Sequence, residues 1–254
     1  MPQYNKIKPS GGDTGKALNL QKRLVFIQKH VTLENKTLLD CGCGTGQYML
    51  ALLTMGVDAF GIECSEDKVR QFRQNNPKNA ERIILGDIEH MTFDDNSFDI
   101  ALLNEVLEHI PSEVNALSEI HRILKPNGIL IIFSPNRLYP FETHGVTLST
   151  RNKRIPPYIP LIPYIPLRYG KKIFRYHARN YWPKELRHIV QTQKFEITYT
   201  GYIWQTFENI SGTQPKIVSV LKPLLRKIFT LLESIPLVQT FGVSQVIIAK
   251  KAAI

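Results

Sequence analysis

An acid followed by three glycines at every second position is the feature of the chain that points most directly to chemistry. Residues 38–46 read LLDCGCGTG, in which Asp40 precedes Gly42, Gly44 and Gly46. Glycine lets a backbone turn sharply and approach a ligand closely, because it has no Cβ. The spacing differs from the phosphate-binding loop G-x-x-x-x-G-K-[ST] and from the dinucleotide fingerprint G-x-G-x-x-G. We therefore expect a ligand-binding loop of another kind, and the spacing disfavours a hydride-transferring enzyme.

Further polar side chains recur where the following predicted strands end. Glu63 closes the second strand and Asp87 the third. Asn104 and Glu105 close the fourth. The carboxyl ends of strands in an open α/β sheet line one ligand-binding crevice. A carboxylate at Glu63 can accept hydrogen bonds from ribose hydroxyls, and one at Asp87 from the amine of adenine, so we predict a nucleoside site there.

These residues need an alternating α/β frame to bring them together. Near-continuous apolar strands alternating with amphipathic helices predict a parallel sheet covered on both faces. The predicted strands are 36–41, 57–63, 82–87, 97–105 and 128–136, and the predicted helices are 16–30, 46–56, 65–75 and 113–125. The last of these helices is expected to be stopped by Pro126 and Gly128.

The motif set resembles the class I S-adenosylmethionine-dependent methyltransferases, of the type 11-like kind, over about residues 35–135. The matching segments are LLDCGCGTG, GIECSEDKV, GDIEHMTFDDNSFDIALLNEVLEHIP and LKPNGILIIFSPN. The resemblance implies S-adenosylmethionine as cofactor and an α/β, Rossmann-like, doubly wound sheet of seven strands. That sheet would be mostly parallel with an antiparallel last strand. The neighbours of His109 in its motif suggest a structural role for this histidine at a helix start.

By this resemblance the glycines would wrap the methionine part of the cofactor, and Glu63 would hold its ribose. Cys64 and Ile88 would flank the adenine, and Asp87 would hold its amine. The expected cofactor-binding residues are Asp40, Gly42, Gly44, Gly46, Glu63, Cys64, Asp87, Ile88 and Asn104. Cysteine at both 41 and 43 is a small departure that leaves cofactor binding intact.

The second half of the chain can complete the sheet. A helix from Trp182 to 193, with Pro183 early in it, precedes a sixth strand at 195–203, and 244–252 fits the seventh. We expect a single domain over 1–254, with a cofactor-binding half at 1–135. A proline-rich lid is expected at 136–181, and sheet completion with a helical insert at 182–254.

The acceptor site should lie just after the fifth strand, in the segment PFETHG at 140–145. His144 could take a proton from a substrate hydroxyl, with Glu142 orienting it, because imidazole titrates near neutral pH. A loop histidine held by backbone hydrogen bonds is the alternative. The expected lining of the substrate pocket is Glu105, His177, Asn180 and Tyr181.

Two apolar, basic segments exceed the minimal fold. Prolines recur every third residue from Pro157 to Pro166, which suits polyproline II and excludes a regular helix or central strand. We expect peripheral membrane contact through 155–175, or a lid packed on its own protein. We expect residues 214–235 to form a strongly apolar helix that Pro223 kinks or splits. Three alternatives are open for this helix: it lies in a bilayer interface, covers the lid or pairs with another subunit.

Charge and cysteine content indicate what the protein contacts and in which compartment it is located. Residues 1–133 carry 14 Lys and Arg against 17 Asp and Glu, a balance of −3, and residues 134–254 carry 18 against 5, a balance of +13. The three cysteines suit a reducing compartment, and Cys41 and Cys43 have no clustered histidines, so we expect no metal site. The N-terminus lacks an apolar signal core, and no apolar run reaches membrane-spanning length. We expect a cytoplasmic location, peripheral on the inner membrane face.

The preferred hypothesis is an enzyme that O-methylates a small, lipid-linked or glycolipid-type acceptor at the cytoplasmic membrane face. C-methylation of a quinone-like ring is the next choice. RNA methylation remains open because of the basic half, although its cations are interleaved with apolar residues and no nucleic-acid module is recognisable. A non-catalytic relative acting as a membrane-surface binding protein is the remaining rival. The sequence predicts neither the acceptor molecule nor the oligomeric state.

Overall fold

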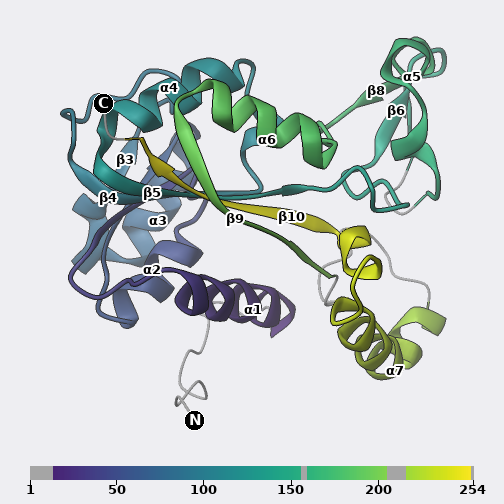
Figure 1. Cartoon of the computed structure of the whole chain (residues 1–254), viewed down its shortest axis with the longest axis horizontal. Coiled ribbons are helices and arrows are strands. Elements are labelled where there is room, and N and C mark those ends of the chain that lie inside the picture. The colour runs from purple at the N-terminus through teal and green to yellow at the C-terminus, as the bar shows by residue number, and fades with distance from the viewer. Residues whose placement is uncertain (1–13, 156–158, 205–215, 253–254) are drawn as a thin grey trace.

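A seven-stranded sheet organises the computed structural model, which describes residues 14–155, 159–204 and 216–252 (Figure 1). The strand order is β3-β2-β1-β4-β5-β10-β9. The strands are β1 Thr37–Cys41, β2 Asp58–Glu63, β3 Ile83–Leu85, β4 Phe98–Asn104, β5 Leu124–Pro135, β9 Phe195–Ile203 and β10 Ser244–Lys251. The predicted Rossmann-like architecture is confirmed, including the antiparallel last strand, because β10 pairs antiparallel with both β5 and β9.

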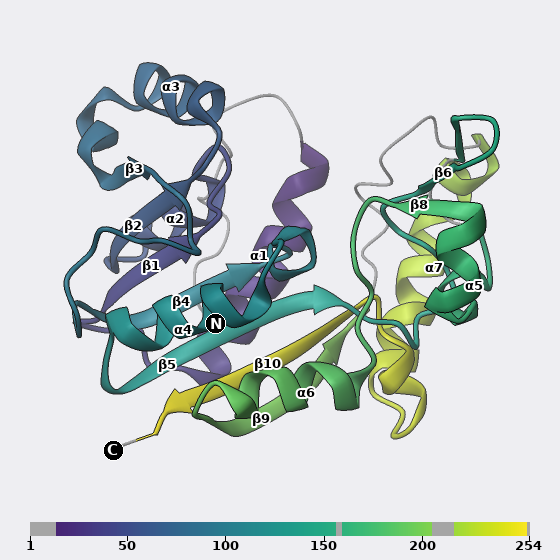
Figure 2. The same ribbon diagram turned by 90° about the horizontal axis from the view of Figure 1, so that it is seen from above.

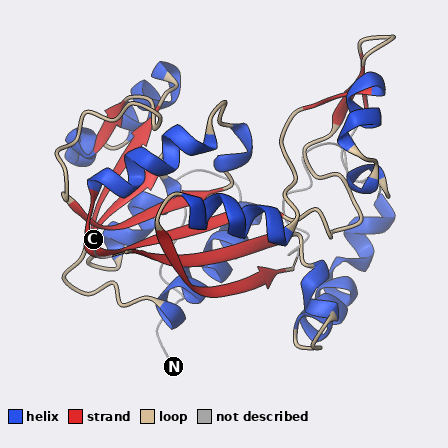
Figure 3. Ribbon diagram, turned by 45° about the horizontal axis from the view of Figure 1, so that its top comes forward, coloured by secondary structure: helices blue, strands red, loops and turns tan. Residues whose placement is uncertain are grey.

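Helices cover both faces of this sheet (Figure 3). The helices are α1 Thr14–His30, α2 Gln47–Thr54, α3 Glu66–Asn75, α4 Glu113–Ile123 and α6 Pro183–Thr192. Helices α1, α2 and α3 pack on one face, and α4 and α6 on the other (Figure 1). Successive residues of β4 point to opposite faces of the sheet. Ile100 and Leu102 belong to the apolar core beneath α1, α2 and α3, and Ala101 and Leu103 to the core beneath α4 and α6. A strand buried on both faces reads as a continuous apolar run, which is why the sequence predicts a parallel sheet.

Two boundaries differ from the sequence prediction. Helix α4 ends at Ile123 and β5 begins at Leu124, so the strand already includes Pro126 and Gly128, which were expected to stop the helix. The pairing of β4 with β5 shifts register here, because Phe98 pairs with Leu124 and Ile100 with Ile129. This irregularity accommodates the additional residues of β5 between the two pairs, among them Pro126 and Gly128. Strand β3 ends at Leu85, two residues before the predicted end at Asp87.

The segment between β5 and α6 forms a small subdomain beyond the carboxyl end of β5 (Figure 2). Its three-stranded antiparallel sheet has the order β7-β6-β8, with β6 Val146–Leu148, β7 Lys153–Ile155 and β8 Phe174–Tyr176. The 3-10 helix η4 Ile162–Tyr164 and the helix α5 Leu167–Ile173 complete it. We call this segment, residues 137–181, the insert.

Polyproline II is the wrong prediction for the described part of the proline run, and Pro157 lies outside the described residues. Leu161 has a φ of 66°, in the left-handed region, and Pro163 lies inside η4. A left-handed residue interrupts the extended backbone that polyproline II requires. Helix α5 begins at Leu167, directly after the last proline of the run, so no regular α-helix lies in the described part of the run itself.

Helix α7 spans Lys216–Glu233 as one helix, so Pro223 does not split it. Its C-terminal end docks on the rest of the molecule, because Glu233 Oε2 lies 2.6 Å from Lys22 Nζ of α1. The ring of Phe229 lies 5.0 Å from that of Trp204, at the end of β9. Among the described helices, none is both long enough and apolar enough to cross a membrane.

Candidate cofactor and acceptor site

The loop between β1 and α2 needs glycine for two different reasons. Gly42, Gly44 and Gly46 all have left-handed φ angles of 70°, 59° and 75°. A Cβ on Gly42 would lie 2.7 Å from Val106, and one on Gly46 would lie 2.5 Å from the Phe72 ring. A Cβ on Gly44 would meet nothing within 4 Å among the described residues. Two of the glycines therefore allow close packing, and the middle one faces open space that a ligand can fill.

Glu63 lies beside this open space, at the end of β2. Its side chain is buried, with Oε2 accepting from Gly44 N at 2.8 Å and Oε1 from Ser65 N at 3.0 Å. The amide of Gly42 donates to Ile62 O at 2.8 Å. The structure thus brings the glycine loop and the tip of β2 to one edge, as the sequence predicts.

Asp40 lies beneath the loop at the end of β1. It is only 2% exposed, and burial together with the charge of Glu63 raises its pKa to about 7. Its Oδ2 has no hydrogen-bond partner within the described ranges. A buried acceptor without a partner is uncommon in proteins. Together with the carboxylate of Glu63, this oxygen forms a set of hydrogen-bond acceptors beside the space at Gly44, which suits the hydroxyl and amine groups of a nucleoside carrying an amino-acid tail.

The loop after β3 lies next to Glu63 but starts earlier than predicted. Gly86 N donates to Glu63 O at 3.1 Å, which holds this loop against β2. Asp87 is exposed and accepts from Glu89 N at 2.9 Å, and Ile88 is buried. Cys64 is exposed, with its Sγ 3.7 Å from Glu63 Oε1. Asp87 therefore reaches the edge from a loop, not from a strand end.

A buried arginine that the sequence reading missed ties the end of β4 to α1. Arg23 is 4% exposed, and its guanidinium bonds to Asn104 Oδ1, to Glu105 at 2.5 Å and to Ser244 Oγ at 2.9 Å. Burial would raise the pKa of Glu105, but Arg23 and Ser244 outweigh it and lower that pKa. Glu105 is thus engaged in a charge pair. An arginine on the apolar face of the predicted helix 16–30 is the only signal that could have identified it.

The segment after β5 presents His144 differently from the expected dyad. Glu142 Oε1 accepts from the backbone N of His144 at 3.0 Å, and Asn180 Nδ2 donates to Glu142 Oε2 at 2.6 Å. The ring Nδ1 of His144 instead lies 3.1 Å from Thr143 Oγ1. Glu142 therefore fixes the turn that carries His144 and does not contact its ring. Burial lowers the pKa of His144, which favours the neutral imidazole that a general base needs.

A cavity of about 420 Å³ separates the 3-10 helix η3 Leu107–His109 from the insert. Its lining is Glu108, His109, Arg137, Pro163, Leu167, Lys171, Tyr176, His177, Ala178, Arg179 and Asn180. His177 and Asn180 were predicted for the substrate pocket. Tyr181 was also predicted, but it is fully buried, with its hydroxyl 3.1 Å from Leu107 O and 2.9 Å from Glu113. Tyr181 belongs to the core that supports the cavity.

Comparison with known proteins agrees with this geometry. Residues 39–132 match the family described as "Methyltransferase domain". An uncharacterised protein of Methanocaldococcus jannaschii is 36% identical over 126 residues, covering 47% of this chain and 52% of that protein. A ubiquinone biosynthesis O-methyltransferase of Coxiella burnetii is 33% identical over 118 residues, covering 45% and 50%. The chain thus spans about half the length of the curated relatives it matches.

The solved structures show the same fold. A SAM-dependent methyltransferase of Methanosarcina mazei aligns with a TM-score of 0.58 at 18% identity, covering 90% of this chain and 98% of that one. At this identity the likeness establishes the architecture alone. The family match and the glycine loop both lie in the segment from β1 to β5, which forms the parallel part of the shared fold.

Proposed function

We propose that this chain, whose residues 39–132 match the methyltransferase domain family, is an S-adenosylmethionine-dependent methyltransferase that methylates an oxygen of a small or lipid-linked acceptor. The observation that carries the proposal is the open space at Gly44, bounded by the carboxylate of Glu63. The similarity to ubiquinone biosynthesis O-methyltransferases supports oxygen as the acceptor atom. C-methylation of a quinone-like ring is the next choice.

The residues that would hold the cofactor are those of the sheet edge. Gly44 leaves room for close approach of the backbone, and the carboxylates of Glu63 and Asp87 are suited to accept from hydroxyl and amine groups. When bound, S-adenosylmethionine supplies an electrophilic methyl group on a sulfonium. The protein then has to align the acceptor oxygen and exclude water. The cavity between η3 and the insert is where we expect the acceptor to lie.

His144 is the proposed general base, positioned by the Glu142–Asn180 pair through the backbone. The expected result for His144→Ala is a loss of kcat of roughly 100-fold or more with unchanged cofactor affinity. Glu142→Gln should move kcat less, because Glu142 acts on the turn and not on the ring. A His144→Ala enzyme with wild-type kcat at every pH would leave His144 as a loop histidine held by Thr143.

Peripheral membrane contact is proposed for the insert and α7. In α5, Tyr169 and Ile173 are 51% and 47% exposed, next to the exposed Lys171 and Lys172. In α7, Leu224, Ile228 and Leu231 are 56%, 43% and 67% exposed. Exposed apolar side chains bordered by cations suit an anionic bilayer interface. The alternation of cations with apolar residues also favours a membrane over RNA.

Co-sedimentation with vesicles tests the membrane proposal. Wild type should bind vesicles rich in anionic lipid and not neutral ones, and Leu231→Asp should weaken this binding. Leu85→Asp is the matched control, because Leu85 is 48% exposed on β3, far from α7. Equal binding of both variants, or retention on RNA that falls steeply with salt, would contradict the membrane proposal.

Transfer of labelled methyl tests the enzymatic proposal. Purified protein is incubated with methyl-labelled S-adenosylmethionine and fractionated cell lipids and glycans, and labelled products are identified by mass spectrometry. We expect one labelled lipid-soluble product carrying an O-methyl group. Cofactor binding without any labelled product would favour a non-catalytic binding protein.

A further inference from the structure

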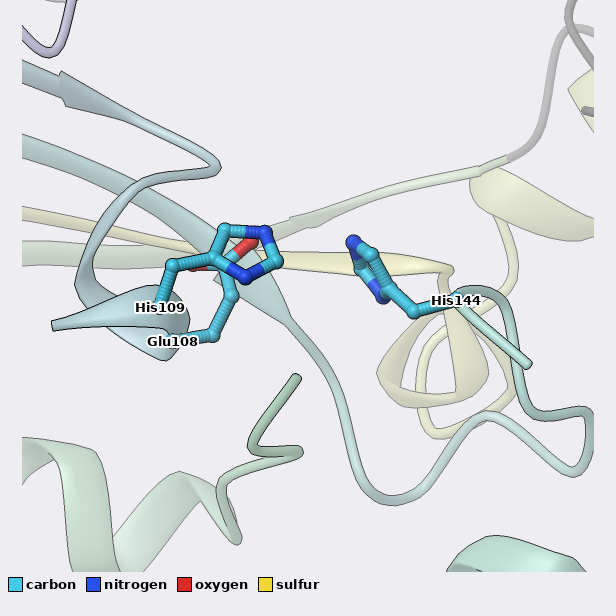
Figure 4. A group of neighbouring side chains, drawn as sticks. All are labelled: Glu108, His109 and His144. Atoms are coloured by element: carbon cyan, nitrogen blue, oxygen red, sulfur yellow. The ribbon is translucent and has the colours of Figure 1, made fainter. Parts of the chain in front are cut away.

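Three potential metal ligands from distant parts of the chain meet at the edge of the cavity. One ligand atom from each of Glu108, His109 and His144 lies within 4.8 Å of the others (Figure 4). Glu108 and His109 belong to η3, and His144 lies in the segment between β5 and β6. The two imidazole rings are 5.3 Å apart at an interplanar angle of 77°. Side chains of these types are ordinary ligands of transition metals.

Glu108 supplies an independent reason to look for a ligand. It is 5% exposed and faces the carboxylate of Glu105, and no N–H or hydroxyl group in the part of the chain that the structure describes donates a hydrogen bond to either of its oxygens. Buried carboxylates are normally paired, hydrogen-bonded or bound to metal, because an isolated one is costly to desolvate. In Figure 4 the carboxylate of Glu108 lies behind the ring of His109, with the ring of His144 opposite them.

We propose that Glu108, His109 and His144 bind one divalent transition-metal cation of the zinc class. Two imidazoles with one carboxylate match the ligand set of open zinc sites, which keep a position for water or substrate. Bonds of about 2.0–2.2 Å in a tetrahedral site put ligand atoms roughly 3.4 Å apart. The ligand atoms, which lie within 4.8 Å of one another, would therefore approach by at most about 1.4 Å on binding. Rotation of His144, which lies in a loop, can supply most of that movement.

The surroundings of the three residues suit such a site. Thr143 Oγ1 lies 3.1 Å from His144 Nδ1, which leaves Nε2 of that ring for the cation. A hydrogen bond to the second ring nitrogen is the usual way a metal-binding histidine is oriented. Glu108 and His109 also line the cavity, so an open coordination position would face it.

With a cation on its Nε2, His144 could not also take the proton of the acceptor, so in the metal-bound protein the cation would replace His144 as the group that activates the proposed acceptor. A Lewis acid at this edge would lower the pKa of a hydroxyl bound to it and orient its oxygen. This role rests on the proposed methyl transfer, whereas the site itself does not. The proposal departs from the sequence expectation of no metal, which considered the cysteines and did not bring His144 next to Glu108.

Zinc binding tests the site directly. Chelator-treated protein is dialysed against Zn²⁺ and its bound metal is counted, and Co²⁺ is used as a visible-absorption probe of coordination. We expect about one Zn²⁺ per chain, with affinity reduced roughly 100-fold or more in His109→Ala, His144→Ala and Glu108→Gln. His188→Ala is the matched control, since His188 is exposed on α6, and it should bind like wild type.

The outcomes separate this proposal from the proposed function. Thermal melts of every variant show whether it is folded, and Glu108→Gln keeps the shape of the side chain if an alanine variant does not fold. Absence of binding to wild type, or unchanged binding in folded His144→Ala and Glu108→Gln, would overturn the metal site. Calorimetry with S-adenosylhomocysteine is run on the metal-free protein. Failure there would count against the methyltransferase proposal and leave the zinc result unaffected.

Discussion

The substitution Gly44→Ala separates ligand binding from folding, because the chain contains a second glycine with the same local geometry. Gly44 has a φ of 59° and Gly56, just after α2, has a φ of 82°. A Cβ at either position would meet nothing within 4 Å among the described residues. Both substitutions therefore place alanine in the left-handed region without a clash, but only Gly44 borders the proposed cofactor space.

The stability effects should match. Left-handed backbone costs an L-residue about 1–2 kcal/mol, and neither site adds an overlap term. In a protein of this size 1 kcal/mol corresponds to roughly 2–4 °C in Tm, so each variant should melt about 2–8 °C below wild type. Gly46→Ala should lose more, because its Cβ would lie 2.5 Å from the Phe72 ring.

The binding effects should differ. A methyl group on Gly44 occupies the space through which the ligand approaches the backbone, and we expect a loss of about tenfold or more in affinity for S-adenosylhomocysteine, or 1.4 kcal/mol. Gly56→Ala should bind within about twofold of wild type. Isothermal titration calorimetry at a temperature where both variants are folded measures this. Equal affinities for Gly44→Ala and Gly56→Ala would refute the placement of the cofactor at this loop.

Three further predictions concern charged side chains. Arg23→Met should destabilise the fold by about 2 kcal/mol in urea unfolding, because it leaves Glu105 unpaired, and adding Glu105→Gln should restore part of that loss, whereas strict additivity would contradict the pair. Burial would raise the pKa of Asp99, but Lys125 and Thr37 hold it well below its usual range. The ionised carboxylate therefore stabilises the fold above about pH 4, and this contribution is lost as the pH falls. Asp99→Asn should flatten the acid side of the curve of stability against pH, and an unchanged slope would contradict this. Burial raises the pKa of Asp40 to about 7, so folding favours its protonated form. The stability of Asp40→Asn relative to wild type should therefore increase between about pH 4 and pH 7 in thermal melts. A constant difference in stability between the two proteins over this range would show that Asp40 is ionised throughout.

The parts of the fold that sequence predicted well are those with strong local periodicity. Strand β9 matches its predicted bounds, and Pro183 begins α6 as expected, since apolar patterning and proline position act within a few residues. The end of α4 was misplaced because Pro126 is accommodated in β5 by an irregularity in its pairing with β4. That accommodation depends on the neighbouring strand and is absent from the local sequence.

The insert was the least predictable segment. Prolines every third residue favour polyproline II locally, but Leu161 adopts a left-handed φ and Pro163 enters η4. The small sheet forms because β6 pairs with both β7 and β8, whose residues are up to 30 positions away in sequence, as in the pair of Val146 with Tyr176. Pairing of such short strands depends on tertiary contacts more than on propensity.

The residues of the candidate site also fall into those that local sequence predicts and those that depend on distant contacts. Gly44 and Glu63 follow from motif spacing, because each ends or follows a regular strand. The pairing of Arg23 with Glu105 and the approach of Glu108 to His144 depend on contacts between segments more than 30 residues apart, which a single sequence does not reveal, although the place of Arg23 on the apolar face of its helix was a local signal of burial. Tyr181 was predicted to line the pocket, whereas its complete burial places it in the core.

Calorimetric titration of the wild-type chain with S-adenosylhomocysteine tests the central claim most directly. The account predicts saturable binding at about one site per chain, abolished or strongly weakened by Glu63→Ala, because that carboxylate lies at the edge of the open space beside Gly44. No detectable heat and no rise in Tm at millimolar ligand would contradict the assignment of this sheet edge as a cofactor site.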